Sequence, residues 1–435
     1  MHKNQDITID AITKIEGNAQ LKAKIRDGKV TDLKFIIGDY RRFYIDAVVG
    51  KAFKAVPPYL SRICGTCSMA HELASIEAIE KALGIHTKIS KQTRTLRTLA
   101  YNGTMIRDHA LHLYIFCLPD VLNIDSVLEI DETDKQNHQL LHDAFDLKAI
   151  GNKLSTVVAG AAVHSPYPTV GGFIKLPTLD EIKILTDELE KGREKILRGI
   201  EVFADWDAIL ERNTDYIALV NDDFNFLEGE IQINDKRRYK ESKFSKLLKE
   251  MVIPYSQSES YIIESSNEDY LVGSLARMNL NGQNIHQNTK KDVKKYLKTF
   301  PSNNIFHNNL AQAIEILHCI DQSIEIIKNL SSITDKNIDA KPKAGEGVGV
   351  LEAPRGTLYH WVKLDDNGVV TEADVTVPTS QNQVNIENDL KEMFQNNIDK
   401  MTKDELKLEA EKIIRAYDPC MSCATNFLKI EWIKE

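Results

Sequence analysis

Two Cys-x-x-Cys pairs, one near each end of the 435-residue chain, constrain its fold more than any other feature. Cys64 and Cys67 form the first pair, and Cys420 and Cys423 form the second. Two intervening residues let both sulfurs of a pair face one centre, so the pairs together can supply four thiolates to a soft or borderline metal. A structural zinc ribbon takes its cysteines from a short stretch, because the metal organises a small fold. Here a large fold must bring distant segments together, which favours an inserted cofactor, although spacing alone leaves structural zinc and a catalytic metal equally open.

Composition excludes several classes of protein. The chain is 42% hydrophobic and 27% charged, and no apolar run approaches the roughly 18 residues that a membrane span needs. Its formal charge of -9, without a basic stripe, argues against a nucleic-acid partner. Six cysteines are too few for a disulfide scaffold in a chain of this length, which favours a reducing compartment. The N-terminus lacks the apolar core of a secretory signal, so we expect a cytoplasmic protein, although a subunit exported with a signal-bearing partner would lack one too.

The periodicity of apolar residues predicts an α+β fold that is mostly helical. Residues 5–37 alternate like strands on either side of Asp27-Gly28, which predicts an antiparallel hairpin in an N-terminal region of residues 1–40. Apolar residues from Leu96 to Cys117 recur every three or four positions, which predicts a long packed helix. Further helical patterns cover residues 136–160, 179–212, 307–331 and 384–417. Residues 214–282 and 344–380 favour loops with short strands, and the absence of a repeat or linker predicts one domain over residues 1–435.

The residues around the cysteines carry a family resemblance. The first motif is Arg62-Ile63-Cys64-Gly65-Thr66-Cys67 followed by His71, and the second is Asp418-Pro419-Cys420-Met421-Ser422-Cys423. Together they resemble, nearly letter for letter, the paired signatures of nickel-iron hydrogenase large subunits, nearest to the soluble cytoplasmic multisubunit branch. Further landmarks of that family follow in the same order: Ile15-Glu16-Gly17, His164, Gly171-Gly172, Tyr270-Leu271-Val272-Gly273, Ala276-Arg277, Asn279, Gly347, Glu352-Ala353-Pro354-Arg355-Gly356, His360, Pro378-Thr379 and Asn382. The resemblance implies the family's fold, with long buried helices and a small N-terminal antiparallel sheet.

The resemblance also implies a metal centre and a reaction. Cys64 and Cys420 would bind nickel terminally, and Cys67 and Cys423 would bridge nickel to an iron that bears carbon monoxide and cyanide. The activity implied is reversible heterolytic cleavage of H2. The remaining cysteines, Cys117 and Cys319, fall within helical patterns and are expected to be buried thiols, which leaves no iron-sulfur cluster to this chain. Electrons would pass first to an iron-sulfur small subunit, then to further electron-transfer subunits, diaphorase or ferredoxin-like.

Proton handling and the open metal position would depend on residues that match the family's motifs. A terminal thiolate, Cys420, is a reasonable first proton acceptor, and Glu16 resembles the glutamate that relays the proton outward; the alternative for Glu16 is a surface residue on a hairpin. Arg355, which follows Pro354 in the Ala-Pro-Arg-Gly turn, resembles the arginine that donates to a cyanide, so we expect this turn to contact the cofactor. Because the pKa of an arginine exceeds 12, electrostatic positioning is favoured over a role as base.

Four further residues surround this arrangement by resemblance. Asp418 and Asp108 would hold Arg355, although Asp108 could equally form a surface ion pair with His112, one helical turn away. Thr379 resembles the hydroxyl donor to the other cyanide. His71 is expected to donate to a bridging sulfur, and its alternative is a core histidine with no role at the metal.

The sequence departs from the family at the site of a third, hard cation. Asn426 stands where the family has a histidine, and Ile45 stands where it has a glutamate, so we expect no magnesium there. Family precursors are usually cut just after that histidine, whereas this chain continues with FLKIEWIKE. An unprocessed precursor, an enzyme that retains its tail and a degenerate relative stay open, and the second is preferred. Two rival functions also stay open: a non-hydrogenase relative in a respiratory-type complex, and a zinc tetrathiolate scaffold.

Overall fold

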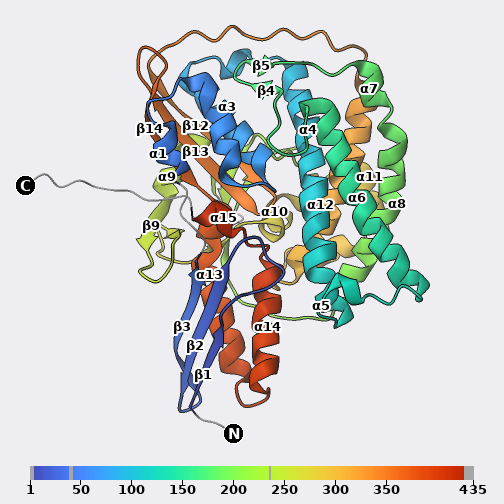
Figure 1. Ribbon diagram of the computed structural model, residues 1–435, viewed down its shortest axis with the longest axis vertical. Coiled ribbons are helices and arrows are strands. Elements are labelled where there is room, and N and C mark those ends of the chain that lie inside the picture. The colour runs from blue at the N-terminus through green and yellow to red at the C-terminus, as the bar shows by residue number, and fades with distance from the viewer. Residues whose placement is uncertain (1–3, 39–42, 235–236, 426–435) are drawn as a thin grey trace, which may run out of the picture.

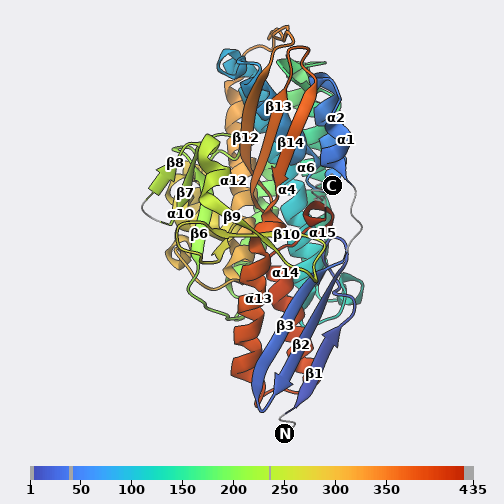
Figure 2. The ribbon, with the colours of Figure 1, turned by 90° about the vertical axis from the view of Figure 1, so that its left-hand side faces the viewer.

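The computed structural model describes residues 4–38, 43–234 and 237–425, and three regions lie around the second cysteine motif (Figure 1). A bundle of long helices lies on one side, a twisted sheet covered by a helix lies on the other, and an arm of strands and helices extends away from both. The view turned by 90° shows that the arm continues the long direction of the sheet (Figure 2). No helix of the described residues is long and apolar enough to cross a bilayer.

The N-terminal sheet contains the predicted hairpin and one further strand. β1 (Gln5–Ile9), β2 (Ala19–Arg26) and β3 (Lys29–Ile37) pair antiparallel in that order. Asp27 and Gly28 both have positive φ, as a two-residue hairpin turn requires. The sheet packs on α13 (Pro378–Asn397), where Glu387 Oε1 accepts a hydrogen bond of 2.9 Å from Phe35 N. The loop between β1 and β2 contains Glu16 and lies at the end of this arm that meets the second cysteine motif.

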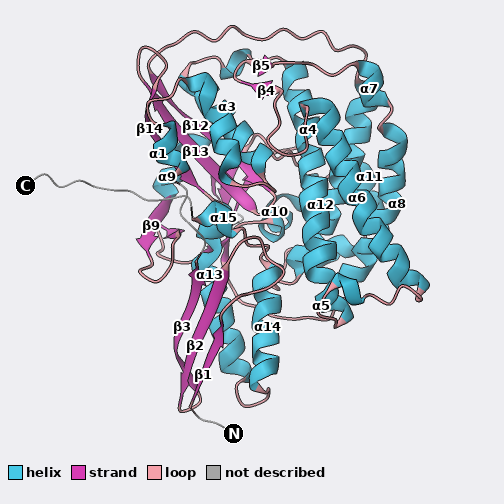
Figure 3. Ribbon diagram, viewed as in Figure 1, coloured by secondary structure: helices cyan, strands magenta, loops and turns pink. Residues whose placement is uncertain are grey.

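The helical bundle contains the long helices that periodicity predicts (Figure 3). Its members are α4 (Lys91–Ala110), α6 (Lys135–Ala159), α8 (Thr186–Ala204) and α12 (His307–Asn329). α4 continues into a π-helical segment, η4 (Leu111–Cys117), so the predicted helix over residues 96–117 is present with a wider last part. Gly103 and Gly151 let α4 and α6 cross closely, because a Cβ at Gly103 would lie 2.7 Å from the carbonyl oxygen of Gly151.

The second sheet carries the hairpin that presents Arg355. β12 (Gly345–Ala353), β13 (Gly356–Leu364) and β14 (Val370–Thr376) pair antiparallel in sequence order. Helix α3 (Ser68–Ala82) lies on this sheet, where Gly347 and Gly349 face the carbonyl oxygens of Ala78 and Ala74. A side chain at either glycine would collide with that backbone, so the contact requires glycine. The strands are longer than the short strands predicted for residues 344–380.

The strand-rich segment predicted over residues 214–282 forms a smaller lobe, and its apolar cluster also includes Val350 of β12 and Tyr359 of β13. Its strands and helix are β6 (Asp215–Val220), β7 (Glu230–Ile233), β8 (Arg237–Tyr239), β9 (Leu248–Val252), β10 (Glu259–Ile263), β11 (Tyr270–Leu271) and α10 (Ser274–Asn281). Four of the strands form a sheet in the order β11-β6-β7-β8, and β9 pairs with β10. The single-domain organisation stays a prediction.

Two predicted helical stretches are interrupted. The stretch 179–212 divides into α7 (Leu179–Lys183) and α8 and ends at Ala204, because the chain beyond it is extended and pairs Glu211 with Asn304. The stretch 384–417 divides into α13 and α14 (Lys403–Ala416). Thr402 accepts a hydrogen bond from Glu405 N and the Glu405 carboxylate accepts one from Thr402 N, so a reciprocal cap starts a new helix inside an apolar periodic run.

Candidate metal centre

The four motif cysteines converge in one buried cluster. Their sulfur atoms all lie within 4.8 Å of one another, and they form the one group of possible metal ligands among the residues that the structure describes. The distance is 3.4 Å between the sulfurs of Cys64 and Cys420, 3.3 Å between those of Cys67 and Cys423, and 3.0 Å between those of Cys420 and Cys423. All four thiols are buried and free of disulfides. Both ends of the described chain therefore contribute equally to one four-sulfur site.

Local backbone structure aims each pair of sulfurs at this cluster. Cys64 is extended after a short turn of helix, and Cys67 is the residue before the first turn of α3. Cys420 forms a bridge with Glu16 and precedes the short helix α15 (Met421–Ala424), with a hydrogen bond of 3.0 Å from Met421 N to Glu16 O. The first motif thus rests on α3, and the second is tied to the loop between β1 and β2.

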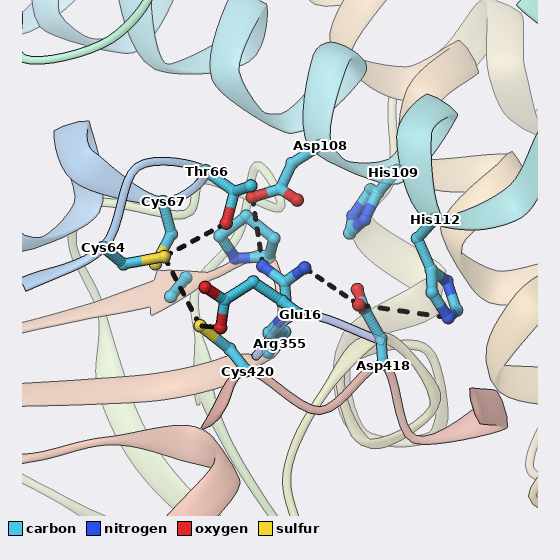
Figure 4. A network of polar contacts seen from close by, with 12 residues as sticks. Glu16, Cys64, Thr66, Cys67, Asp108, His109, His112, Arg355, Asp418 and Cys420 are labelled. Carbon is cyan, nitrogen blue, oxygen red and sulfur yellow. Dashed lines mark hydrogen bonds and ion pairs between the residues drawn. The ribbon is translucent and has the colours of Figure 1, made fainter. Parts of the chain in front are cut away.

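The carboxylate of Glu16 lies directly against the second motif (Figure 4). Its Oε2 atom is 3.1 Å from Cys420 Sγ and accepts a hydrogen bond of 3.0 Å from Ser422 N. The Ser422 hydroxyl donates to the other carboxylate oxygen. Glu16 is half-buried, and these contacts place it at the cluster of four cysteines rather than on the outer face of a hairpin.

Arg355 lies between two carboxylates beside the sulfurs (Figure 4). One terminal nitrogen is 3.1 Å from Asp108 Oδ2, and the other is 2.9 Å from Asp418 Oδ1. Burial alone would lower the pKa of Arg355, but Asp108 and Asp418 raise that pKa well above its usual value, so the side chain is a cation. Asp108 is 1% exposed and pairs with Arg355, whereas His112 lies 3.9 Å from Asp418.

Two further predicted residues contact the cluster. His71 Nε2 is 3.5 Å from Cys423 Sγ, and His71 Nδ1 is 3.1 Å from His360 Nε2. Burial lowers the pKa of His71 to about 4, so its ring is neutral. Thr379 Oγ1 accepts a hydrogen bond of 2.8 Å from Cys420 N, at the start of α13. Pro354 is the first of the two turn residues between β12 and β13.

The residues present fit a metal group of the kind that the resemblance implies. Four thiol groups form a soft donor set, which suits nickel and iron as well as zinc. A structural zinc site is closed by its ligands, whereas here a carboxylate, a guanidinium and an imidazole also face the sulfurs. Arg355 Nε and Asp108 Oδ1 are buried polar atoms without a hydrogen-bond partner in the described part of the chain. A donor left unpaired beside the sulfurs suits an acceptor carried by the bound group.

The buried four-thiol site defines a class of protein, one that can bind a soft metal ion through thiolates inside a large fold. A family model described as nickel-dependent hydrogenase matches residues 46–170 and 237–426. The chain is 30% identical to the alpha subunit of sulfhydrogenase 2 from Pyrococcus furiosus, over 98% of this chain and 100% of that protein. It is 28% identical to one subunit of the F420-non-reducing hydrogenase from Methanothermobacter thermautotrophicus, over 97% of this chain and 94% of that protein.

Solved structures agree on the fold. An NAD+-reducing [NiFe]-hydrogenase in the H2-reduced state matches with a TM-score of 0.87 at 22% identity, over 98% of this chain and 100% of that chain. The reduced, active Ni-Fe-Se hydrogenase from Desulfomicrobium baculatum matches with a TM-score of 0.77 at 20% identity, over 97% of this chain and 100% of that chain. The chain therefore belongs to the nickel-dependent hydrogenases and is a large subunit of that family, as the motifs predict.

Several residues at the site carry no signal that sequence reasoning could use. Ser422 is an unmarked position inside the second motif, yet it donates twice to Glu16. Arg107 holds the carbonyl oxygens of Thr66 and Ala162, and Thr66 Oγ1 lies 3.1 Å from Cys64 Sγ. His360 is one of the family landmarks named from the sequence, but only the structure places its ring against His71.

The third cation and the tail fall largely outside the part of the chain that the structure describes. Asn426 and the nine residues after it are not among the described residues. Ile45 lies in the short helix α1 (Tyr44–Val48) and is half-buried. The expected absence of magnesium stays a prediction.

Proposed function

We propose that Cys64, Cys67, Cys420 and Cys423 hold a nickel-iron centre with carbon monoxide and cyanide ligands, at which H2 is cleaved heterolytically and reversibly. Nickel would take Cys64 and Cys420 as terminal ligands, and Cys67 and Cys423 would bridge to iron. The observation that carries the proposal is the convergence of four buried sulfurs within 4.8 Å, next to the Glu16 carboxylate. When bound, the two metals supply a redox-active Lewis-acidic site that polarises the H–H bond.

The proton would leave through this chain's own groups. Cys420 Sγ is the first acceptor, because it is a terminal thiolate whose sulfur lies 3.1 Å from Glu16 Oε2. Glu16 takes the proton from sulfur and passes it outward. Ser422 holds the carboxylate in place through its amide and its hydroxyl, which keeps Oε2 aimed at the sulfur.

The cationic Arg355 orients what binds at the open position. Asp108 and Asp418 fix its two terminal nitrogens and leave Nε as the donor that would hydrogen-bond to one cyanide. Its raised pKa favours electrostatic positioning over proton abstraction. Pro354 fixes the turn that carries Arg355 and would line the same side of the bound group.

His71 and Thr379 would complete the surroundings of the centre. His71 donates through Nε2 to Cys423, because His360 holds its other nitrogen and fixes the ring. The Thr379 hydroxyl oxygen accepts from Cys420 N and so leaves its own hydrogen for the second cyanide.

Electrons would pass to a partner protein. The relatives are named as single subunits of larger hydrogenases, which supports assembly with an iron-sulfur small subunit. Cys117 and Cys319 are buried and separate from the metal cluster, so this chain is proposed to hold no iron-sulfur cluster. The same proposal includes further subunits of the diaphorase or ferredoxin-like kind and a cytoplasmic location. It also includes the absence of a magnesium ion, because Ile45 and Asn426 stand in place of its ligands.

Metal analysis combined with infrared spectroscopy of the purified complex tests this function. Nickel and iron together with sharp carbon monoxide and cyanide bands are the expected result. Zinc alone would replace the proposal by a structural tetrathiolate scaffold. A complex without metal would instead favour a respiratory-type relative that has lost the chemistry.

A further inference from the structure

A second buried arginine holds the base of the turn that presents Arg355. Arg277, on α10, is 2% exposed and donates to the carbonyl oxygens of Ala353 and Pro354, each at 3.0 Å. These carbonyls belong to the two residues immediately before Arg355 in the hairpin between β12 and β13. Glu352 accepts from Arg277 Nη1 at 2.9 Å, so three consecutive residues are held by one guanidinium.

Arg277 is itself fixed by Glu315 on α12. The Glu315 carboxylate accepts from Arg277 Nε at 2.6 Å and from Nη2 at 2.7 Å, which is a bidentate pair with both partners buried. Burial opposes ionisation, but Arg277 lowers the pKa of Glu315 to about 2. Such a pair fixes the plane of the guanidinium and therefore the direction in which its remaining N–H groups point.

Helix α4 contacts both the guanidinium of Arg355 and the pair formed by Arg277 and Glu315. Asp108 on α4 contacts the guanidinium of Arg355, and the next residue, His109, lies 2.9 Å from Glu315 Oε2 through Nε2. One end of Arg355 is therefore tied to α4 through Asp108. Its main chain is tied to α4 through Pro354, Arg277, Glu315 and His109 in turn.

We propose that Arg277, fixed by Glu315, is a positioning residue that sets where Arg355 stands over the thiol cluster. The inference rests on the proposed role of Arg355. Arg277 acts through the turn alone, because the hydrogen bonds of its guanidinium go to residues 274, 315 and 352–354 and to none of the four cysteines. A lysine at position 277 would keep the charge but lose the planar guanidinium that donates to two carbonyl oxygens and two carboxylates.

A double-mutant cycle on the purified complex tests the inference. The variants are Arg277→Lys, Arg355→Lys and the double variant, each measured for nickel and iron content, melting temperature, and the rate of H2 oxidation with its KM and kcat. Arg277→Lys is expected to lower kcat by on the order of 10- to 100-fold at unchanged KM and metal content, because misplacement of a positioning group costs rate. In the Arg355→Lys background it should lower kcat no further, since the two residues act through one another.

The matched control is Arg97→Lys. Arg97 is also buried, also forms a bidentate pair with a glutamate, Glu80, and also donates to a main-chain carbonyl, that of Thr169. It donates to no residue of the Arg355 turn, so its effect should be confined to melting temperature and be the same in both backgrounds.

The outcomes separate the role of Arg277 from that of Arg355. An equal loss of kcat from Arg277→Lys in both backgrounds would overturn the positioning role and leave the role of Arg355 intact. Full activity of Arg355→Lys would overturn the proposed role of Arg355, and this inference with it. If Arg277→Lys yields no folded complex, Glu315→Gln takes its place in the cycle, because it keeps the side-chain shape and weakens the grip on Arg277, with the same outcomes.

Discussion

At the scale of single residues, the site depends on contacts between segments that are far apart in the chain. The cysteines, Glu16 and Arg355 could be predicted because each lies in a short motif that is recognisable by itself. The contacts of Ser422 and Arg277 could not be predicted, because no periodicity encodes contacts over such separations. Ser422 contacts a residue 406 positions away, and Arg277 contacts residues 38 to 77 positions away. From the sequence, Asp108 could pair equally well with Arg355 or with His112. The structure decides for Arg355, because the two side chains form a buried ion pair.

The Glu16 carboxylate offers the most direct test at this scale. Glu16→Gln keeps the hydrogen bond from Ser422 N to the side-chain oxygen but removes the group that takes a proton from Cys420 Sγ. We expect the rate of H2 oxidation to fall by about 100-fold or more, in line with the loss of a positioned acid-base group. Nickel content and melting temperature should stay near those of the unaltered complex. Asp10→Asn, an exposed change in the same loop, is the control.

Asp108 provides a second prediction. Asp108→Asn removes one of the two carboxylates that flank the Arg355 cation, while Asp418 stays at 2.9 Å. Leaving a buried cation with half of its compensation should destabilise the chain by about 1–3 kcal/mol and lower activity. The thermal midpoint reports the loss of stability, and the rate of H2 oxidation reports the loss of activity. A variant with an unchanged midpoint and an unchanged rate would show that the pair of Asp108 and Arg355 contributes to neither stability nor activity.

At the scale of helices and strands, glycine decides how closely α3 approaches β12. The presence of strands in this segment could be predicted from composition. The close approach of α3 to β12 could not, because it depends on which glycines of β12 contact the backbone of α3. The interruption between α13 and α14 has a local cause that the sequence does show, the reciprocal cap of Thr402 and Glu405, which the longer apolar period obscured.

Gly349→Ala tests the contact between α3 and β12. The new methyl group would meet the carbonyl oxygen of Ala74 and push α3 away from the sheet. Because Cys67 precedes the first turn of α3, we expect both a lower melting temperature, corresponding to roughly 1–3 kcal/mol, and a lower nickel content. Gly38→Ala is the matched control, since no described residue beyond its chain neighbours lies within 4 Å of the Cβ that it would add. Equal effects of the two substitutions would contradict the packing argument.

At the scale of the whole molecule, both ends of the described chain must be in place before the metal site exists. One apolar core includes residues of β1 and β2, the helical bundle and the second cysteine motif. The α+β class and the convergence of the two motifs could be predicted from the sequence. The positions of the smaller lobe and the arm could not be predicted, because they follow from packing between segments that are far apart in the chain.

Metal should stabilise this arrangement, because a ligand that binds only the folded chain shifts the unfolding equilibrium. The metal-free chain is therefore expected to melt at a lower temperature than the loaded one and to react faster with a thiol-alkylating reagent at the four motif cysteines. Cys319→Ala, which alters a buried thiol outside the cluster, should preserve the difference between loaded and metal-free protein. Identical melting and labelling of both forms would show that the cluster is not the metal site.

X-ray absorption at the nickel edge of the purified complex tests the central claim most directly. We expect nickel surrounded by sulfur, with a nearby iron atom, and loss of that sulfur signal when Cys64, Cys67, Cys420 and Cys423 are all replaced by serine. Nickel bound only through nitrogen and oxygen in the unaltered complex, or a sulfur signal that persists in the fourfold variant, would contradict a nickel site built on these four thiols.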